Sequence, residues 1–386
     1  MAQFQSGDVF QEYTYPLPVY EFDLGSKREG LEDMRAGSLR ERHLEIGSLK
    51  GATRAEVAIE YWSGHVGTGG HQFRVNGNHW LDLPHPENTL TRPERYHHNM
   101  LGNPAVPIPL EHLRPGVNSF QFRTGPQIAY DMDWGLYWVY AFTLRVYQEP
   151  TEGHPSGEIV APMQGATIGD HPTLSAAARG PHAAISSVDF VGHYEDYDWE
   201  GDGVYRKWHY QYQLGNIRRH LGSAFQPPYE VTWDTTWVPD QEEPVALMAR
   251  VADSRGFTSI TPEVSVKLAR ANRRVSMSKA KDVPEGFFSR VGQRKECTID
   301  VTDSLTGAQE ARLSLSTWCG AHCDEIGLNG TRLVERVGAV HHYSYDLIPV
   351  PIELIKTGAN VFHILSHTEE HAIEVNWPGP ALLVSY

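Results

Sequence analysis

The chain has 386 residues, more than one hydrophobic core usually organises, so we expect two or three domains. Apolar residues make up 40% of the chain and charged residues 21%, a balance that excludes an intrinsically disordered protein. The net charge of −15 argues against a nucleic-acid partner and against docking to an anionic membrane. The sequence contains no run of 18 apolar residues, so we expect no membrane-spanning helix.

Glycine and proline are frequent, at 35 and 25 residues, and aromatic residues make up 11% of the chain. This mixture favours turn-rich β structure over helical bundles. The expected fold class is therefore all-β, with several β-sandwich domains in one chain.

The N-terminal third of the chain is repeated, in diverged form, in the C-terminal third. Residues 55–64 (AEVAIEYWSG) align with residues 311–320 (ARLSLSTWCG), and residues 106–122 align with residues 350–364. Apolar and polar residues alternate in both copies, which predicts strands. The matched blocks keep their order, so we expect the two thirds to share one topology.

Each copy carries an Asn-Gly pair, at 76–77 and at 329–330, which predicts a tight hairpin turn because both positions tolerate positive φ. A Gly-x-Asn turn precedes a later strand in each copy, at 116–118 and at 358–360. A strand, the Asn-Gly turn and this later segment together resemble galactose-binding-like β-sandwich domains, the jelly rolls common in carbohydrate-active proteins.

The resemblance implies one such sandwich over residues 1–150 and a second, after a linker, within residues 271–386. The segment between them, residues 151–270, has short alternating strands separated by turn signals. Its order of motifs, including Trp233-Asp234 and the stretch from Ala249 to Gly256, resembles bacterial immunoglobulin-like modules. We therefore expect a central immunoglobulin-like β-sandwich.

The sharpest local motif is an acidic loop in the middle segment. Asp196, Asp198, Glu200 and Asp202 place carboxylates at alternate positions before a glycine, as in the first half of a calcium loop. Lys207 stands where an EF-hand needs its bidentate glutamate, so the loop is not an EF-hand. The alternatives are a calcium site and a solvated turn between strands.

Histidine is unusually frequent, at 20 residues, and occurs in clusters that fall at matching places in the two copies. Aromatic rings, imidazoles and acid or amide groups together suit sugar recognition, because flat apolar faces stack on sugar rings and planar polar groups hold hydroxyls. We therefore expect a polysaccharide or oligosaccharide partner. The candidate carbohydrate-binding residues are His97, His98, Tyr130, Asp133, Trp134, His341, His367, Glu370 and Trp377.

An alternative interpretation is a glycan-active enzyme, either a polysaccharide lyase or a glycoside hydrolase. Its candidate catalytic residues are His342, His371 and Glu374, with histidine as base and Glu374 as its orienting group or as acid. A transition metal at the C-terminal histidines is a weaker possibility. A third alternative is a structural or assembly protein, and the sequence leaves the oligomeric state open.

No phosphate loop, dinucleotide fingerprint, nucleophile elbow or HExxH motif occurs, so no organic cofactor is expected. The N-terminal residues lack the basic and apolar regions of a signal peptide. We expect a cytoplasmic protein unless a signal peptide has been removed, in which case the protein is secreted or periplasmic.

Overall fold

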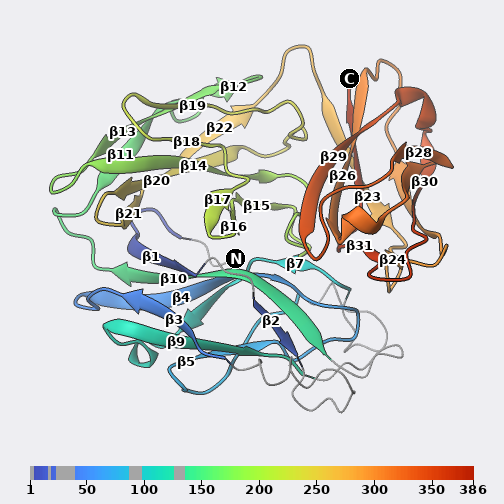
Figure 1. Cartoon of the computed structure of the whole chain (residues 1–386). Coiled ribbons are helices and arrows are strands. Elements are labelled where there is room, and N and C mark those ends of the chain that lie inside the picture. Colours follow the sequence, from blue (N-terminus) through green and yellow to red (C-terminus); the bar gives the residue numbers. More distant parts are fainter. Residues whose placement is uncertain (1–3, 16–18, 23–39, 87–97, 126–134) are drawn as a thin grey trace.

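The computed structural model describes residues 4–15, 19–22, 40–86, 98–125 and 135–386, and these residues are almost entirely β-strands and turns (Figure 1). The predicted fold class, an all-β chain of several sandwiches, is confirmed. The helical elements of the described residues are three 3-10 turns: η2 (Leu110–His112), η3 (Gly320–His322) and η4 (Ile352–Leu354).

The N-terminal part is a sandwich of two sheets around one hydrophobic core. In the first sheet β10 lies between β1 and β4, and β4 continues to β7 and β8. In the second sheet β9 lies between β3 and β5, and β5 continues to β6. The first sheet comprises β1 (Val9–Tyr15), β2 (Val19–Phe22), β4 (Ala52–Trp62), β7 (Leu101–Gly102), β8 (Ala105–Ile108) and β10 (Leu136–Gln148). The second comprises β3 (Arg42–Ile46), β5 (Gln72–Val75), β6 (Leu81–Asp82) and β9 (Gly116–Arg123).

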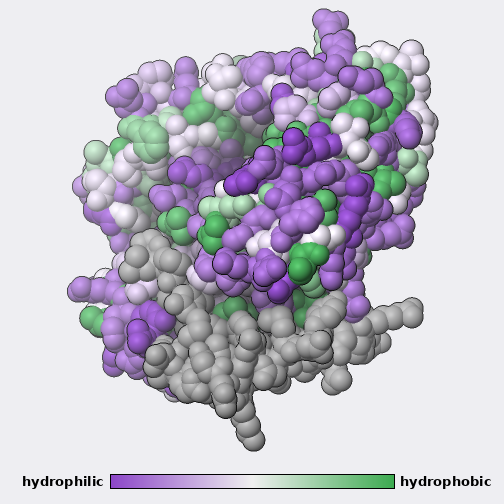
Figure 2. All heavy atoms as spheres, turned by 45° about the vertical axis from the view of Figure 1, so that its right-hand side comes forward, coloured by the Kyte–Doolittle hydropathy of each residue, from purple (hydrophilic) through white to green (hydrophobic). Residues whose placement is uncertain are grey.

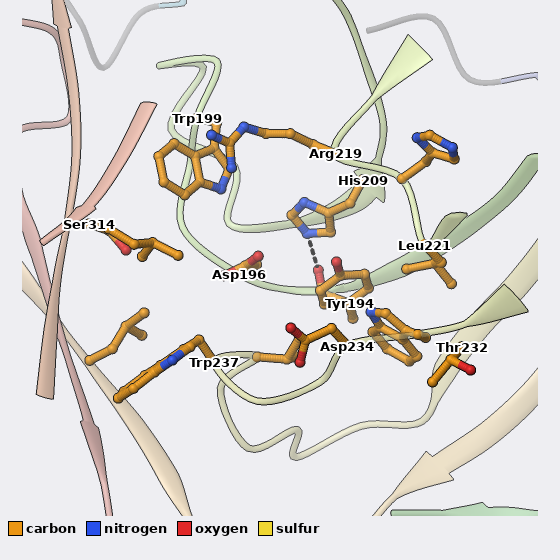
Figure 3. Close-up of a pocket in the computed structure, with 15 residues that line it drawn as sticks. Tyr194, Asp196, Trp199, His209, Arg219, Leu221, Thr232, Asp234, Trp237 and Ser314 are labelled. Atoms are coloured by element: carbon orange, nitrogen blue, oxygen red, sulfur yellow. Dashed lines mark hydrogen bonds between the residues drawn. The ribbon is translucent and has the colours of Figure 1, made fainter. Parts of the chain in front are cut away.

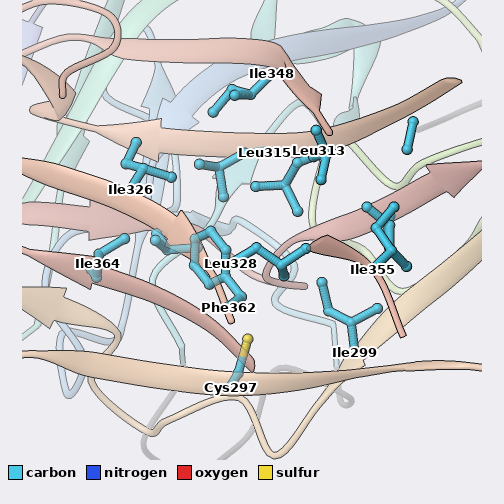
Figure 4. Packing of buried hydrophobic residues seen from close by; sticks show 14 of the residues in the cluster. Cys297, Ile299, Leu313, Leu315, Ile326, Leu328, Ile348, Ile355, Phe362 and Ile364 are labelled. Atoms are coloured by element: carbon cyan, nitrogen blue, oxygen red, sulfur yellow. The ribbon is translucent and has the colours of Figure 1, made fainter. Parts of the chain in front are cut away.

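The C-terminal part repeats the order of the main strands in both layers. Here β32 lies between β23 and β26, β26 pairs with β29, and the opposite layer runs β25-β30-β27-β28. The first layer comprises β23 (Val275–Lys281), β24 (Phe288–Ser289), β26 (Glu310–Trp318), β29 (Tyr343–Val350), β31 (Ile373–Val375) and β32 (Ala381–Ser385). The opposite layer comprises β25 (Lys295–Val301), β27 (Glu325–Leu328), β28 (Thr331–Val334) and β30 (Gly358–Leu365). Figure 4 shows the aliphatic core between these layers.

The two copies also share one hydrogen-bond network at the predicted Asn-Gly turn. Asn76 has a φ of 50°, and its Nδ2 donates to Asn118 Oδ1 at 2.8 Å. Asn329 has a φ of 51°, and its Nδ2 donates to Asn360 Oδ1 at 2.9 Å. Asn118 and Asn360 also hold the turn before their own strands. Each side chain accepts one backbone N–H bond and donates to two backbone carbonyls of that turn. The two copies identified in the sequence therefore share the same hydrogen bonds at this turn.

The middle part is a third sandwich with its own core, within residues 159–268. Its smaller sheet has the order β11-β13-β19, and in its larger sheet β20 pairs with β14, β21 and β22. Because β21 also pairs with β1, the larger sheet is continuous with the N-terminal sandwich. The strands are β11 (Ser156–Ala161), β12 (Thr167–Ile168), β13 (Thr173–Arg179), β14 (Ile185–Glu195), β15 (Arg206–His209), β16 (Gln211–Gln213), β17 (Asn216–Arg218), β18 (Gly222–Ala224), β19 (Tyr229–Thr232), β20 (Val245–Asp253), β21 (Phe257–Ile260) and β22 (Val264–Leu268).

Residues 196–221, between β14 and β18, link the middle sandwich to both copies. The Tyr197 hydroxyl donates to the carbonyl of Gly379 in the C-terminal copy. The backbone N–H of Leu214 donates to Glu60 Oε2 of the N-terminal copy at 2.7 Å. We refer to residues 196–221 as the linking segment.

Candidate functional site

The tryptophans at equivalent repeat positions pack against each other where the two copies meet. The rings of Trp62 and Trp318 stack at 4.0 Å with an interplanar angle of 3°, and both side chains are fully buried. The Trp318 indole Nε1 donates to the Tyr140 hydroxyl at 2.8 Å. Both tryptophans are therefore core residues, and they offer no face to a sugar.

The predicted carbohydrate-binding residues that the structure describes do not form one surface. His97, Tyr130, Asp133 and Trp134 lie outside the described residues. His98 is buried and stacks on Trp377 at 4.6 Å, and the backbone N–H of Trp377 donates to the carbonyl of Asn99. These contacts join the N-terminal and C-terminal copies, so this pair serves packing between them.

The remaining predicted residues lie around the loop between β30 and β31. His367 is exposed beside Asp324, with Nδ1 3.1 Å from the carboxylate, and Glu370 is also exposed. His371 packs against His341 with ring centres 4.2 Å apart.

The proposed catalytic residues of the same region are not gathered at one point. His342 packs on Tyr140, with its Nδ1 2.9 Å from the carbonyl of Tyr343, whereas His371 contacts His341. Glu374 is buried and pairs with His65 Nδ1 at 2.8 Å. The catalytic assignment of His342, His371 and Glu374 therefore stays a prediction for which the contacts give no support.

The acidic loop holds a lysine at its centre. The Lys207 ammonium lies 2.8 Å from Asp198, 2.5 Å from Glu200 and 2.8 Å from Asp202, and its side chain is 9% exposed. These three carboxylates are the one group of possible metal ligands in the described part of the chain whose oxygens lie within 4.8 Å of one another. The ammonium takes the place that a calcium ion needs, so these residues do not fit calcium as they stand.

Asp196, the fourth predicted calcium ligand, instead lines a cavity between the middle and C-terminal sandwiches (Figure 3). The cavity has a volume of about 320 Å³. Tyr194 reaches it from the end of β14, and Asp196, Trp199, His209 and Arg219 reach it from the linking segment. The remaining lining residues include, after β19, Trp233, Asp234 and Trp237, and from the C-terminal sandwich Ser314, Leu347 and Leu383.

The Arg219 guanidinium is the main positive group of this cavity. Its central carbon lies 3.5 Å from the ring centre of Trp199 and 4.2 Å from that of Tyr345. No carboxylate of the described residues forms an ion pair with Arg219, and its Nε is buried without a hydrogen-bond partner. Burial lowers the pKa of Arg219, because nearby groups compensate the desolvation of its charge only in part.

The acidic groups of the cavity are shifted in opposite directions. Burial raises the pKa of Asp196 to about 6, although Asp196 accepts a hydrogen bond from the N–H of Tyr197. Hydrogen bonds from Thr236 lower the pKa of Asp234, whose side chain is exposed at the cavity. Burial lowers the pKa of His209 to about 3, so its imidazole is neutral beside the carbonyl of Tyr194. The cavity thus combines the neutral imidazole of His209, the Asp196 carboxyl group with its raised pKa of about 6, and the ionised carboxylate of Asp234.

The sequence interpretation missed most of this site. Trp233 and Asp234 marked a strand of the immunoglobulin-like module, and Trp199 lay inside the supposed calcium loop. A usable signal was present, because Trp199, Trp233 and Trp237 fall within 40 residues of a chain that has ten tryptophans. Their convergence depends on the linking segment and the residues after β19 lining the same cavity, which spacing alone does not reveal.

The chain matches no family model and no curated protein. Among solved structures, similarity extends to fibronectin(III)-like modules of CbhA from Clostridium thermocellum, at 14% identity over 60% of this chain and 86% of that one, with a TM-score of 0.20. It also extends to a β-porphyranase of glycoside hydrolase family 86 from Bacteroides plebeius, at 13% identity over 62% of this chain and 38% of that one, with a TM-score of 0.23. A Salmonella α-2-macroglobulin matches at 10% identity over 100% of this chain and 23% of that one, with a TM-score of 0.20. These likenesses are too low to add to the argument from the site.

Among the described residues, no helix has the length and apolar character needed to cross a membrane. Figure 2 shows a mostly hydrophilic face on which apolar side chains form small separate groups. The large apolar residues that are most exposed, Met163 at 78% and Phe225 at 71%, lie in different loops of the middle sandwich.

Proposed function

We propose that the protein binds carbohydrate in the cavity between the middle and C-terminal sandwiches. The single observation that carries this proposal is the convergence of three indoles, two carboxylates and an arginine without a carboxylate partner on one cavity. Indole faces suit the apolar C–H faces of sugars, and carboxylate and guanidinium groups bind pairs of neighbouring hydroxyls. Galactose-binding-like scaffolds for the twin sandwiches are part of the same proposal.

Trp237 is the indole best placed to meet a ligand. Trp199 and Trp233 are largely buried, whereas Trp237 is half-buried and faces the cavity opposite Trp199 in Figure 3. A bound sugar ring would therefore pack on Trp237, with Asp196 and Arg219 on its polar edge. The volume of about 320 Å³ accommodates one or two sugar residues of a longer chain.

Affinity electrophoresis in gels that contain different polysaccharides tests the proposal. The protein should be retarded by at least one polysaccharide, and Trp237→Ala should weaken the binding by about tenfold, since a lost stacking contact is worth about 1 kcal/mol or more. Trp80→Ala is the matched control, because Trp80 is also half-buried but lies in the N-terminal sandwich under Arg74 and Arg123. Absence of retardation by every polysaccharide, or equal effects of both substitutions, would contradict the proposal.

Glycoside hydrolysis at the same cavity is the second candidate function. The observation that favours it is the opposite pKa shift of Asp196 and Asp234, because one protonated and one ionised carboxyl group are what a hydrolase needs as acid and base or nucleophile. Release of reducing sugar that is lost in both Asp196→Asn and Asp234→Asn would support hydrolysis. Binding that is followed by no product, even after long incubation, would leave recognition as the function.

A further inference from the structure

Four histidines gather where the N-terminal and C-terminal copies meet, away from the proposed sugar cavity. His65 follows β4, His322 ends η3, His341 precedes β29 and His371 precedes β31. The ring centre of His371 lies 4.2 Å from that of His341 and 6.4 Å from that of His322. His65, His341 and His371 each lie about 6 Å from the ring of Trp318. Segments far apart in the chain thus bring three imidazoles around one buried indole, with His322 beside His371.

Two of these imidazoles have ring nitrogens that the protein does not use. His322 Nε2 and His341 Nε2 are buried and have no hydrogen-bond partner among the described residues. A buried polar atom without a partner destabilises the folded state, so a native structure retains it where another group satisfies it. A neutral imidazole nitrogen that lacks a donor is a ready ligand for a metal ion.

The fourth histidine is held by a carboxylate. His65 Nδ1 lies 2.8 Å from Glu374 Oε1, and the Glu374 side chain is only 4% exposed. An imidazole fixed by a carboxylate on one nitrogen presents its other nitrogen in a defined direction, which is the usual outer-shell arrangement of metal sites.

From these contacts we propose that His322, His341 and His371 bind a divalent transition-metal ion of the zinc class, with the His65–Glu374 pair beside the metal as a fourth ligand or as a partner of a bound water. Three imidazoles with an open fourth position are a common ligand set for zinc. The proposal is independent of the sugar cavity, which shares none of these residues.

Metal binding requires movement of more than one of these side chains, because the described contacts join His371 to His341 and to His322 but do not join His322 to His341. Two imidazoles on one tetrahedral zinc have ring centres about 5 Å apart, between the 4.2 Å and 6.4 Å observed around His371. The ring nitrogens of the three histidines are spread more widely than the carboxylate oxygens of Asp198, Glu200 and Asp202, which all lie within 4.8 Å of one another. His371 is exposed on its loop, so its side chain can move toward a shared ion, and His322 or His341 has to move with it.

Titration calorimetry with Zn²⁺ on the full chain, after dialysis against chelator, tests the site. The unsubstituted protein should bind about one Zn²⁺ per chain, and His371→Ala should weaken binding by at least tenfold. His43→Ala is the matched control, because His43 is an exposed histidine on β3 whose removal should leave the affinity unchanged.

Cobalt(II) supplies a second readout that reports the ligand set itself. Replacement of Zn²⁺ by Co²⁺ should give visible absorption typical of four-coordinate cobalt, and His322→Ala should abolish it while far-ultraviolet circular dichroism stays unchanged. If His322→Ala fails to fold, the exposed His371→Ala variant decides the question alone. Failure of the unsubstituted protein to bind Zn²⁺, or equal affinity in His371→Ala and the unsubstituted protein, would overturn the proposal.

Discussion

Replacing Lys207 by methionine tests whether an ammonium group, rather than a metal ion, neutralises the acidic loop. The Lys207 side chain is 9% exposed, and those of Asp198, Glu200 and Asp202 are 0%, 6% and 25% exposed. Methionine keeps most of the length and the apolar stem of lysine but removes its charge. Three carboxylates then share a buried space without a cation.

The expected loss of stability is large. Removal of one partner from a buried ion pair costs about 3–5 kcal/mol, because the remaining charge loses its compensation. Burial already raises the pKa of Asp198 to about 6 with Lys207 present, so the carboxylates of Lys207→Met should take up protons more readily still. We expect a loss of about 4 kcal/mol at neutral pH and a smaller loss near pH 5, because carboxylates that bind protons in the folded state gain stability as the pH falls.

The same substitution should create the calcium site that the sequence suggested. Three carboxylates without a competing ammonium offer the oxygen ligands that calcium prefers. A calcium concentration of about a hundred times the dissociation constant would raise the free energy of unfolding of the variant by about 2.7 kcal/mol. The unsubstituted protein should gain nothing, because Lys207 fills the position.

Urea unfolding, followed by tryptophan fluorescence in excess calcium and in chelator, measures both effects. Lys279→Met is the control, because the ion pair of Lys279 with Glu195 is partly exposed and its loss should change stability by less than about 1 kcal/mol. Equal stabilisation of the unsubstituted protein and Lys207→Met by calcium would refute the assignment of the site to Lys207. So would a Lys207→Met variant as stable as the control variant.

Two further predictions concern other buried polar groups. Burial raises the pKa of Glu60 from 4.5 to about 7, so the folded state binds this proton more tightly and stability falls as the pH rises through that range. Glu60→Gln should reduce the difference in unfolding free energy between about pH 5 and about pH 8 by up to about 3 kcal/mol. Urea unfolding that gives the same difference for the variant and the unsubstituted protein would contradict this. Asn118→Ala and Asn360→Ala each delete the same four hydrogen bonds, so each should cost about 2–3 kcal/mol. Thermal unfolding that shows a large loss for only one of them would disprove their equivalence.

The topology of the twin sandwiches could be predicted because its determinants are local. An Asn-Gly pair fixes a turn through φ values that few residues adopt, and the Gly-x-Asn turn lies 39 residues after it in the first copy and 28 in the second. Alternation then sets which strand face is buried. The stack of Trp62 on Trp318 was beyond such reasoning, because it depends on how the completed sandwiches dock.

The acidic loop shows why a ligand pattern alone misleads. The spacing of Asp198, Glu200 and Asp202 suits a cation, and a cation is indeed present, but the chain supplies it from Lys207 on β15. Register decides this, because Lys207 pairs with Tyr194 across the β14–β15 hairpin and its side chain thereby reaches the loop. A sequence pattern records which groups are near in the chain, whereas neutralisation of charge depends on which groups are near in space.

The linking segment makes the proposed sugar cavity a property of the whole chain rather than of one sandwich. Arg219 and Trp199 belong to this segment, Trp237 belongs to the middle sandwich, and Ser314 belongs to the C-terminal copy. The segment is also bonded to both copies, through Tyr197 to Gly379 and through Leu214 to Glu60. A separated middle domain would therefore keep Trp233 and Trp237 but lose one wall of the cavity. Carbohydrate binding at this cavity should require the middle and C-terminal sandwiches together, and a fragment limited to residues 151–270 should bind no more tightly than the Trp237→Ala variant.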